Sequence, residues 1–282
     1  FWRTRIKQEE KLRIHIKSPG RVNLIGEHTD YNGGYVLPCA LNLTIDLFFE
    51  KKSKESYVNT DLGYSMTFDV NIPYKKSNNH WENYVLGAIN ELKKIKSELS
   101  NFSCMIKSTL PSGAGISSSS ALVCGLIKGL SKLNEIKLEN SDIINLSRNV
   151  EHKYIGLLGG IMDQFTILNA EKNMAILLNC ENLETKFIKL EFKEYKLLLL
   201  DTNVKHNLAN TEYNQRVSEC KESLEIINGL CKENYSNLSQ VNKIDLSSSK
   251  EKLGKTLYKR ASYVINENQR VINSVEFLEN DK

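Results

Sequence analysis

Two glycines followed by four serines, within residues 110–121, combine residue types that can bind an anion. Gly113 and Gly115 permit backbone angles that other residues avoid, and they let a ligand approach the main chain closely. The apolar run after the serines predicts a helix, whose free N–H groups would favour a phosphate. Serine hydroxyls there can cap the helix or bind a metal that accompanies the phosphate. The pattern therefore indicates a phosphate-binding turn, with an ordinary capped turn as the alternative.

A second candidate site lies in residues 21–34, where Arg21, Glu27, His28 and Asp30 occur within ten residues and are bracketed by glycines. Charged residues and glycines packed together on a loop favour ligand binding. A solvated turn would explain the glycines but not the dense mixture of hydrogen-bonding side chains.

A third candidate is Asp163, which follows Gly159 and Gly160 and lies in the apolar run of residues 161–165. A carboxylate in such surroundings is usually paired or functional. Glu151 lies on the last turns of the predicted helix before it.

The elements that must position these residues follow from periodicity. Strands are predicted over residues 12–17, 45–50, 57–60, 104–107, 174–179 and 195–201. Helices are predicted over residues 80–97, 141–154, 211–230 and 261–278, and directly after the glycine turn. Residues 18–20 are expected to break the first strand. Residues 202–206 are expected to form a loop, and residues 234–252 a loop or a mobile segment. Strands with segregated helices favour an α+β fold.

Composition excludes several function classes. The 282 residues are 40% hydrophobic and 26% charged, as in soluble globular proteins, and suffice for one large or two ordinary domains. The formal charge is only +4 and the lysines are spread along the chain, so we expect no nucleic-acid partner. No apolar run approaches the length of a membrane span. The six cysteines lack metal-ligand spacing, which predicts reduced thiols in a cytoplasmic protein.

Four separated segments together resemble the galactokinase family of the GHMP small-molecule kinases. Residues 20–32 (GRVNLIGEHTDYN) are similar to the galactokinase signature, and residues 111–121 resemble the superfamily's phosphate-binding motif. Residues 160–165 (GIMDQF) resemble the segment with the catalytic carboxylate, and residues 203–213 resemble a sugar-contacting segment.

The resemblance implies an α+β fold of two domains with the active site in the cleft between them. Residues 1–185 would form a domain like the second domain of ribosomal protein S5, and residues 186–282 a ferredoxin-like domain. The family continues past Lys282 with a third glycine-rich motif, so the second domain is expected to be truncated here.

The resemblance also assigns roles to individual residues. Asp163 would be the catalytic base, with Arg21 as the neighbouring cation. The magnesium ligands would be Ser119 and Glu151. Sugar binding would fall to Glu27, His28, Thr29, Asp30, Gly160 and Tyr213. ATP phosphates would bind Gly113, Ala114, Gly115, Ile116, Ser117, Ser118 and Ser119.

The expected reaction is phosphorylation of the anomeric hydroxyl of α-D-galactose by MgATP, in a cytoplasmic monomer or weak dimer. Two alternatives stay open: a kinase for a related sugar such as N-acetylgalactosamine or arabinose, and a non-catalytic sensor of sugar and nucleotide. The intact serine run favours a kinase over a sensor, whereas the missing third motif favours the sensor.

Overall fold

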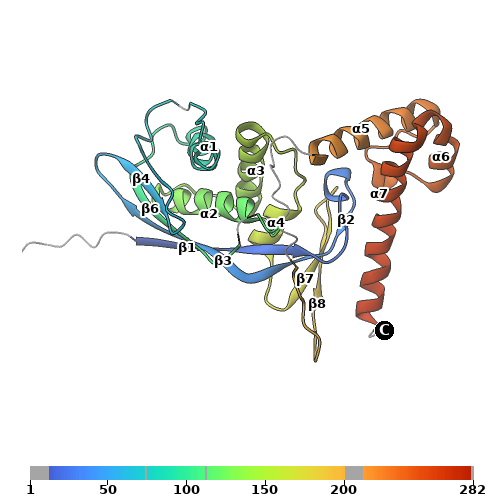
Figure 1. Cartoon of the computed structure of the whole chain (residues 1–282), viewed down its shortest axis with the longest axis horizontal. Helices are drawn as coiled ribbons and strands as arrows, with labels where there is room; N and C mark the ends of the chain where they lie inside the picture. Colours follow the sequence, from blue (N-terminus) through green and yellow to red (C-terminus); the bar gives the residue numbers. More distant parts are fainter. Residues whose placement is uncertain (1–12, 74, 112, 201–211, 281–282) are drawn as a thin grey trace, which may run out of the picture.

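The computed structural model describes residues 13–73, 75–111, 113–200 and 212–280. Its largest sheet has five strands in the order β1-β3-β6-β4-β5 (Figure 1). All neighbouring pairs are antiparallel except β4 and β6, which are parallel. The strands are β1 (Arg13–Asn23), β3 (Pro38–Lys51), β4 (Ser56–Thr60), β5 (Ser65–Phe68) and β6 (Phe102–Ser108).

Three helices cover one face of this sheet: α1 (Glu82–Lys93), α2 (Ser118–Leu133) and α3 (Asn140–Val150). α2 packs on β1 and β3, and the other two helices pack against α2. Close approach depends on Gly129, where a Cβ atom would lie 2.1 Å from the ring of Phe49. The fully buried core of this layer therefore fixes the position of α2, whose first residues are the serine run.

The first strand differs from its prediction. Residues 18–20 do not end it, and β1 continues to Asn23 with a register shift between Pro19 and Arg21. A proline is tolerated there because β1 is an edge strand, where a missing N–H and a bulge cost little. The continuation places Arg21 within a strand rather than on a free loop.

A second, three-stranded sheet has the order β2-β7-β8 and only antiparallel pairs. It consists of β2 (Tyr35–Val36), β7 (Met174–Asn179) and β8 (Thr185–Lys189). Three short helical elements connect these parts: η1 (Asp30–Asn32) lies between β1 and β2, and η2 (Glu151–Ile155) and α4 (Met162–Asn169) lie between α3 and β7. The α+β class is confirmed. The domain boundary at residues 185/186 stays a prediction.

The C-terminal part, as far as the structure describes it, contains helices and no strand beyond Lys189. They are α5 (Glu212–Leu230), η4 (Leu238–Gln240), α6 (Lys243–Ser248) and α7 (Lys250–Glu279). The prediction of a loop over residues 234–252 is wrong, because buried Leu238 and Leu246 join this region to the helical core. α7 likewise begins well before residue 261, with a kink at Gly254 (φ 63°, ψ −174°).

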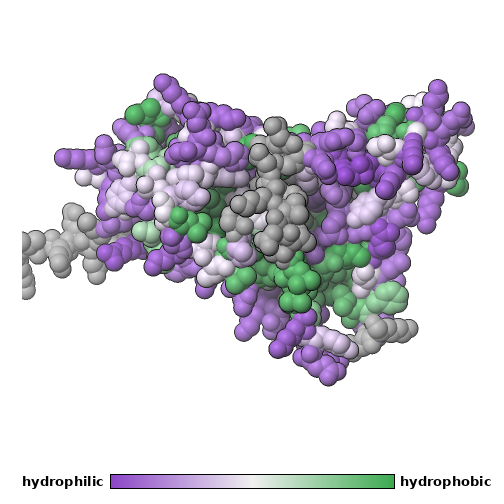
Figure 2. All heavy atoms as spheres, viewed as in Figure 1, coloured by the Kyte–Doolittle hydropathy of each residue, from purple (hydrophilic) through white to green (hydrophobic). Residues whose placement is uncertain are grey.

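The predicted strand over residues 195–201 is also wrong for residues 195–200, which form no strand. A strand needs a neighbour for its backbone groups, and no strand ladder of the described residues includes this segment. Leu198 and Leu200 are 75% and 80% exposed. Figure 2 shows hydrophobic residues gathered on this face of the molecule, near β7 and β8. Residue 201 and the predicted loop over residues 202–206 lie outside the described residues.

Within the described ranges, no helix combines the length and apolar character that crossing a bilayer requires.

Candidate active site

Asp163 lies in the first turn of α4, where a carboxylate is favoured by the partial positive charge of the helix end. Arg21 of β1 donates from Nε to its Oδ1 at 2.6 Å. The hydroxyl of Ser117 donates to its Oδ2 at 2.5 Å. Both carboxylate oxygens are thus held in fixed directions by groups from two other elements.

The glycine–serine turn is tied to the same arginine. The Arg21 backbone N–H donates to the carbonyl of Ile116, and its Nη1 donates to the carbonyl of Gly115 at 3.0 Å. Gly113 and Gly115 have positive φ, and nothing lies within 4 Å of where their Cβ atoms would be. The turn therefore has open space on its side-chain side, as a cradle for a phosphate needs.

Ser117 precedes α2 in the left-handed conformation (φ 59°) and makes no side-chain capping bond. The suggestion that a serine caps this helix is therefore wrong for Ser117, because its hydroxyl is engaged by Asp163. The unpaired N–H groups at the start of α2 remain free of a side-chain cap, which suits an anion.

Glu151 begins the π-turn η2 and is 3% exposed. Ser120 donates to its Oε1 at 2.6 Å, and Gln164 donates to its Oε2 at 2.8 Å. Burial raises the pKa of Glu151 to about 7, which the Ser120 hydroxyl opposes and the charge of Asp163 reinforces. Ser119, the other predicted metal ligand, lies close to the hydroxyl of Tyr84, whose pKa burial raises and Ser119 lowers in part.

Asp30 lies in η1 and faces Gly160, where a Cβ atom would be 2.1 Å from its Oδ2. Burial, reinforced by the charge of Asp163, raises the pKa of Asp30 to about 6. The structure thus brings two predicted sugar-binding residues together and places both near the predicted base. Only glycine at residue 160 permits this approach.

Tyr213 of α5 lies near Asp30 and Gly160. Its ring lies 5.9 Å from that of His28 and 5.5 Å from that of Tyr31. The Gly160 backbone hydrogen-bonds to it, while burial and the charge of Asp30 raise the pKa of its hydroxyl. His28 has φ 64°, and its Nδ1 lies 2.8 Å from the Tyr31 hydroxyl. Burial and two nearby arginines lower the pKa of His28.

The other two predicted sugar-binding residues have different surroundings. Glu27 accepts from the Asn23 amide at 3.1 Å, and burial, together with the charge of Glu267, raises its pKa. The hydroxyl of Thr29 is fully buried and lies 2.7 Å from both the Gly26 and Tyr35 carbonyls. Thr29 therefore holds the loop in shape with its side chain.

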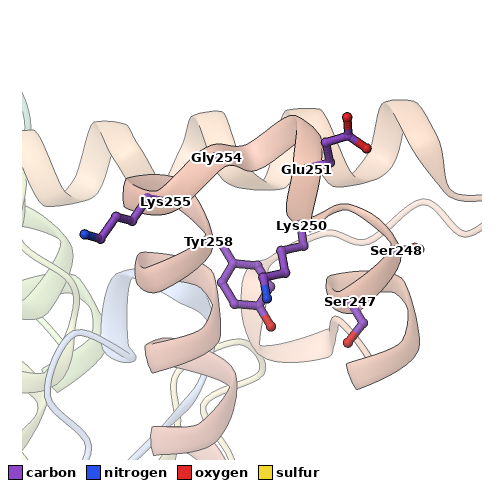
Figure 3. A pocket seen from close by; sticks show the side chains of 7 residues that line it. All are labelled: Ser247, Ser248, Lys250, Glu251, Gly254, Lys255 and Tyr258. Atoms are coloured by element: carbon purple, nitrogen blue, oxygen red, sulfur yellow. The ribbon is translucent and has the colours of Figure 1, made fainter.

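Sequence reasoning missed three residues that hold the predicted ones: Ser120, Gln164 and Glu267. Gln164 follows Asp163 as a second polar residue in an apolar run, and this pattern could have indicated a buried hydrogen-bonding role. Glu267 gave no local signal, because it lies among the polar residues Asn266, Asn268, Gln269 and Arg270 of the last helix. The hollow in Figure 3 lies elsewhere, at the kink of α7, and none of the predicted site residues lines it. Among the described residues, no group of three His, Cys, Asp or Glu side chains could hold a metal.

Comparison with known proteins places this site in a family. Residues 3–51 match the galactokinase galactose-binding signature, and residues 83–171 match the N-terminal domain of GHMP kinases. The chain is 37% identical to the galactokinase of Thermosipho africanus, over 95% of this chain and 73% of that protein. The chain belongs to the galactokinase family. The galactokinase of Thermotoga maritima is 36% identical, over 94% of this chain and 72% of its own length.

Solved structures agree with membership of the galactokinase family. The crystal structure of Lactococcus lactis galactokinase complexed with galactose superimposes with a TM-score of 0.83 and 29% identity, covering 95% of this chain and 70% of that one. A mevalonate kinase superimposes with a TM-score of 0.55 at 22% identity, which shows a shared fold. The signature match includes Arg21 and the loop with Glu27 and Asp30, so the family resemblance and the clustered side chains coincide.

Proposed function

We propose that this chain transfers the γ-phosphoryl group of ATP to the anomeric hydroxyl of α-D-galactose, giving galactose 1-phosphate and ADP. The observation that carries the proposal is the position of Asp163. Arg21 and Ser117 each hydrogen-bond one of its carboxylate oxygens. Arg21 lies in the segment that matches the galactose-binding signature, and Ser117 ends the glycine–serine turn.

Asp163 is proposed as the general base. The anomeric oxygen forms a bond to the γ-phosphorus as the bond from phosphorus to ADP breaks, and the hydroxyl proton passes to the carboxylate. A positioned base of this kind contributes about a hundred- to ten-thousand-fold to the rate. Arg21 orients the carboxylate and keeps a positive charge beside the reacting groups.

The glycine–serine turn is proposed to hold the ATP phosphates through the backbone of residues 113–119. Its open glycines and the uncapped start of α2 support this role. Phosphoryl transfer depends mainly on positioning and electrostatic stabilisation, which fixed N–H donors supply.

Ser119 and Glu151 are proposed to hold Mg²⁺ with the phosphates. One hydroxyl and one carboxylate fit the usual protein share of an Mg²⁺ shell, in which phosphates and waters complete the oxygen ligands. The bound cation would neutralise charge on the transferring phosphoryl group. Glu151 has a raised pKa in the protein alone, and a neighbouring cation would favour its ionised form. Ser120 and Gln164 fix the direction of its carboxylate.

Galactose is proposed to bind through Glu27, His28, Asp30 and Tyr213, with Gly160 leaving room for Asp30 and Thr29 supporting the loop. A site built to hydrogen-bond specific hydroxyls rejects epimers that leave those groups unpaired. We also propose a cytoplasmic location and a monomer or weak dimer. The six cysteines are all free, as expected in a reducing compartment.

The test is a coupled assay of ADP release across galactose, N-acetylgalactosamine and arabinose. We expect the highest kcat/KM with galactose. Faster turnover of either other sugar would overturn the substrate assignment. Galactose binding without ADP release from any sugar would identify a sensor.

A further inference from the structure

The loop of residues 26–35, which carries the proposed sugar-binding residues, is held at both ends by two consecutive residues of α7. At its start, Glu267 Oε1 accepts from the backbone N–H of Gly26 at 2.8 Å and of Glu27 at 3.3 Å. At its end, Asn268 Oδ1 accepts from the backbone N–H of Tyr35 at 2.7 Å. These contacts span more than 230 residues of sequence.

Glu267 is well suited to this contact because it is buried, 3% exposed, and fully partnered. Its Oε2 accepts from Arg270, at 2.8 Å from Nε and 2.6 Å from Nη2. Burial alone would raise the pKa of Glu267, but the Gly26 N–H and Arg270 outweigh burial and lower it. Hydrogen bonds to an ionised acceptor are about twice as strong as neutral ones.

Two glycines of the loop bring it close enough for these bonds. Gly26 has φ 107°, and a Cβ atom there would lie 3.1 Å from Val271 of α7. At Gly34, a Cβ atom would lie 2.9 Å from Oδ1 of Asn268 and 2.5 Å from the hydroxyl of Ser239. α7 and the segment after α5 therefore pack directly on the loop backbone.

We propose that Glu267 and Asn268 are positioning residues that clamp the loop in its sugar-binding shape. The loop includes His28 at positive φ, a conformation that a non-glycine residue leaves readily when it is not held. If the clamp is lost, only a fraction of molecules keep the binding shape, and the apparent sugar affinity falls by that fraction. α7 packs against α5, α6, η4, β2 and β8, whereas the glycine–serine turn is bonded to Arg21 of β1. We therefore expect loss of the clamp to weaken sugar binding and to leave ATP binding unchanged.

The kinetic part of this inference rests on the proposed function, so the experiment also measures hydrogen exchange, which does not depend on activity. We compare wild type with Glu267→Ala, Asn268→Ala and Glu267→Gln, the last of which keeps an acceptor oxygen. Gln269→Ala is the matched control, because Gln269 is exposed on the same helix and its amide donates to Asn273. Melting temperatures identify any variant that has lost its fold. Steady-state kinetics give KM for galactose and for ATP, and hydrogen exchange without ligand reports the amides of Gly26, Glu27 and Tyr35.

We expect the two alanine variants to raise KM for galactose by about ten-fold or more, since buried hydrogen bonds to a carboxylate or amide oxygen are lost. KM for ATP stays within about two-fold. Exchange accelerates at Gly26 and Glu27 in Glu267→Ala and at Tyr35 in Asn268→Ala. Glu267→Gln retains most of the wild-type behaviour, and Gln269→Ala all of it.

Two failures are distinguishable. If the wild-type protein does not phosphorylate galactose but hydrogen exchange is still accelerated in the alanine variants, the proposed function is overturned and the clamp is supported. An active wild type whose folded alanine variants keep their KM for galactose and their exchange rates overturns the clamp. Equal increases in both KM values would also overturn it, because they indicate a general structural defect.

Discussion

Nε of Arg21 lies 2.6 Å from Oδ1 of Asp163, joining β1 to the start of α4 across 142 residues. The same arginine also bonds the backbone of the glycine–serine turn. One cation thus sets the distance between the predicted base and the predicted phosphate site.

Replacing Asp163 by Asn is expected to lower kcat by about a hundred- to ten-thousand-fold, because the side chain keeps its shape but no longer takes a proton. Galactose binding by calorimetry should change by only a few-fold. Asp61→Asn is the control, since Asp61 is exposed and its carboxylate accepts from the backbone N–H of Ser108 at 2.9 Å. Turnover of Asp163→Asn within a few-fold of wild type would refute the role of a base.

Glu151→Gln and Ser119→Ala are expected to raise the Mg²⁺ concentration needed for half-maximal activity, by about ten-fold or more for Glu151. A neutral amide is a weaker ligand for a hard cation than a carboxylate, and alanine removes an oxygen altogether. Mg²⁺ titrations of activity at saturating ATP give the midpoint. An unchanged midpoint with a lower melting temperature would show that Ser119 stabilises the start of α2 instead of binding the metal.

Gly160→Ala should weaken galactose binding by about ten-fold, because the new methyl group would lie 2.1 Å from Oδ2 and 2.9 Å from the backbone of Asp30. The backbone contact means that rotating the Asp30 side chain does not relieve the clash. Calorimetry with galactose measures the effect. Gly159→Ala is the neighbouring control, where the Cβ atom meets only Glu151 Oε2 at 3.8 Å. Similar affinities in both variants would show that the Asp30 position is unimportant for the sugar.

Asp30 should make the protein less stable as the pH rises. Its pKa is raised to about 6, so the folded state binds more protons than the unfolded state. Its favourable contribution is full below about pH 4 and is lost by about pH 7, a change of about 3 kcal/mol in the free energy of unfolding. Urea denaturation of wild type and Asp30→Asn across this range checks it.

Other buried acids remain in both proteins, so the difference between the two pH slopes reports Asp30 together with its interaction with Asp163. Asp30→Asn should lose less stability than wild type between pH 4 and pH 7. Parallel slopes would mean that the carboxylate titrates as it does in the unfolded chain.

Local signals were strong where one short segment contains the whole pattern. The turn with Gly113 and Gly115 and the helix after it were predictable because glycines, serines and an apolar run follow each other directly. The local sequence pattern gave the wrong secondary structure where packing against distant parts of the chain determined it. Residues 234–252 are polar on average, yet Leu238 and Leu246 are buried in the helical core, and the segment forms η4, α6 and the start of α7. Residues 195–200 are apolar, yet they form no strand, because strand formation depends on a neighbour.

By itself, the sequence determined the family and predicted the residues proposed to carry its chemistry, since residue types and their spacing along the chain are covalent facts. Only the tertiary structure decided which of those residues meet. Ser117 was expected to face a phosphate and also bonds Asp163, and Asp30 was expected beside a sugar and lies against Gly160. The clamp by Glu267 was equally hidden, because a bond across 241 residues leaves no periodic trace in either segment. Such contacts depend on how sheets and helices pack in three dimensions, and that packing is set by the whole buried core rather than by any one stretch of sequence.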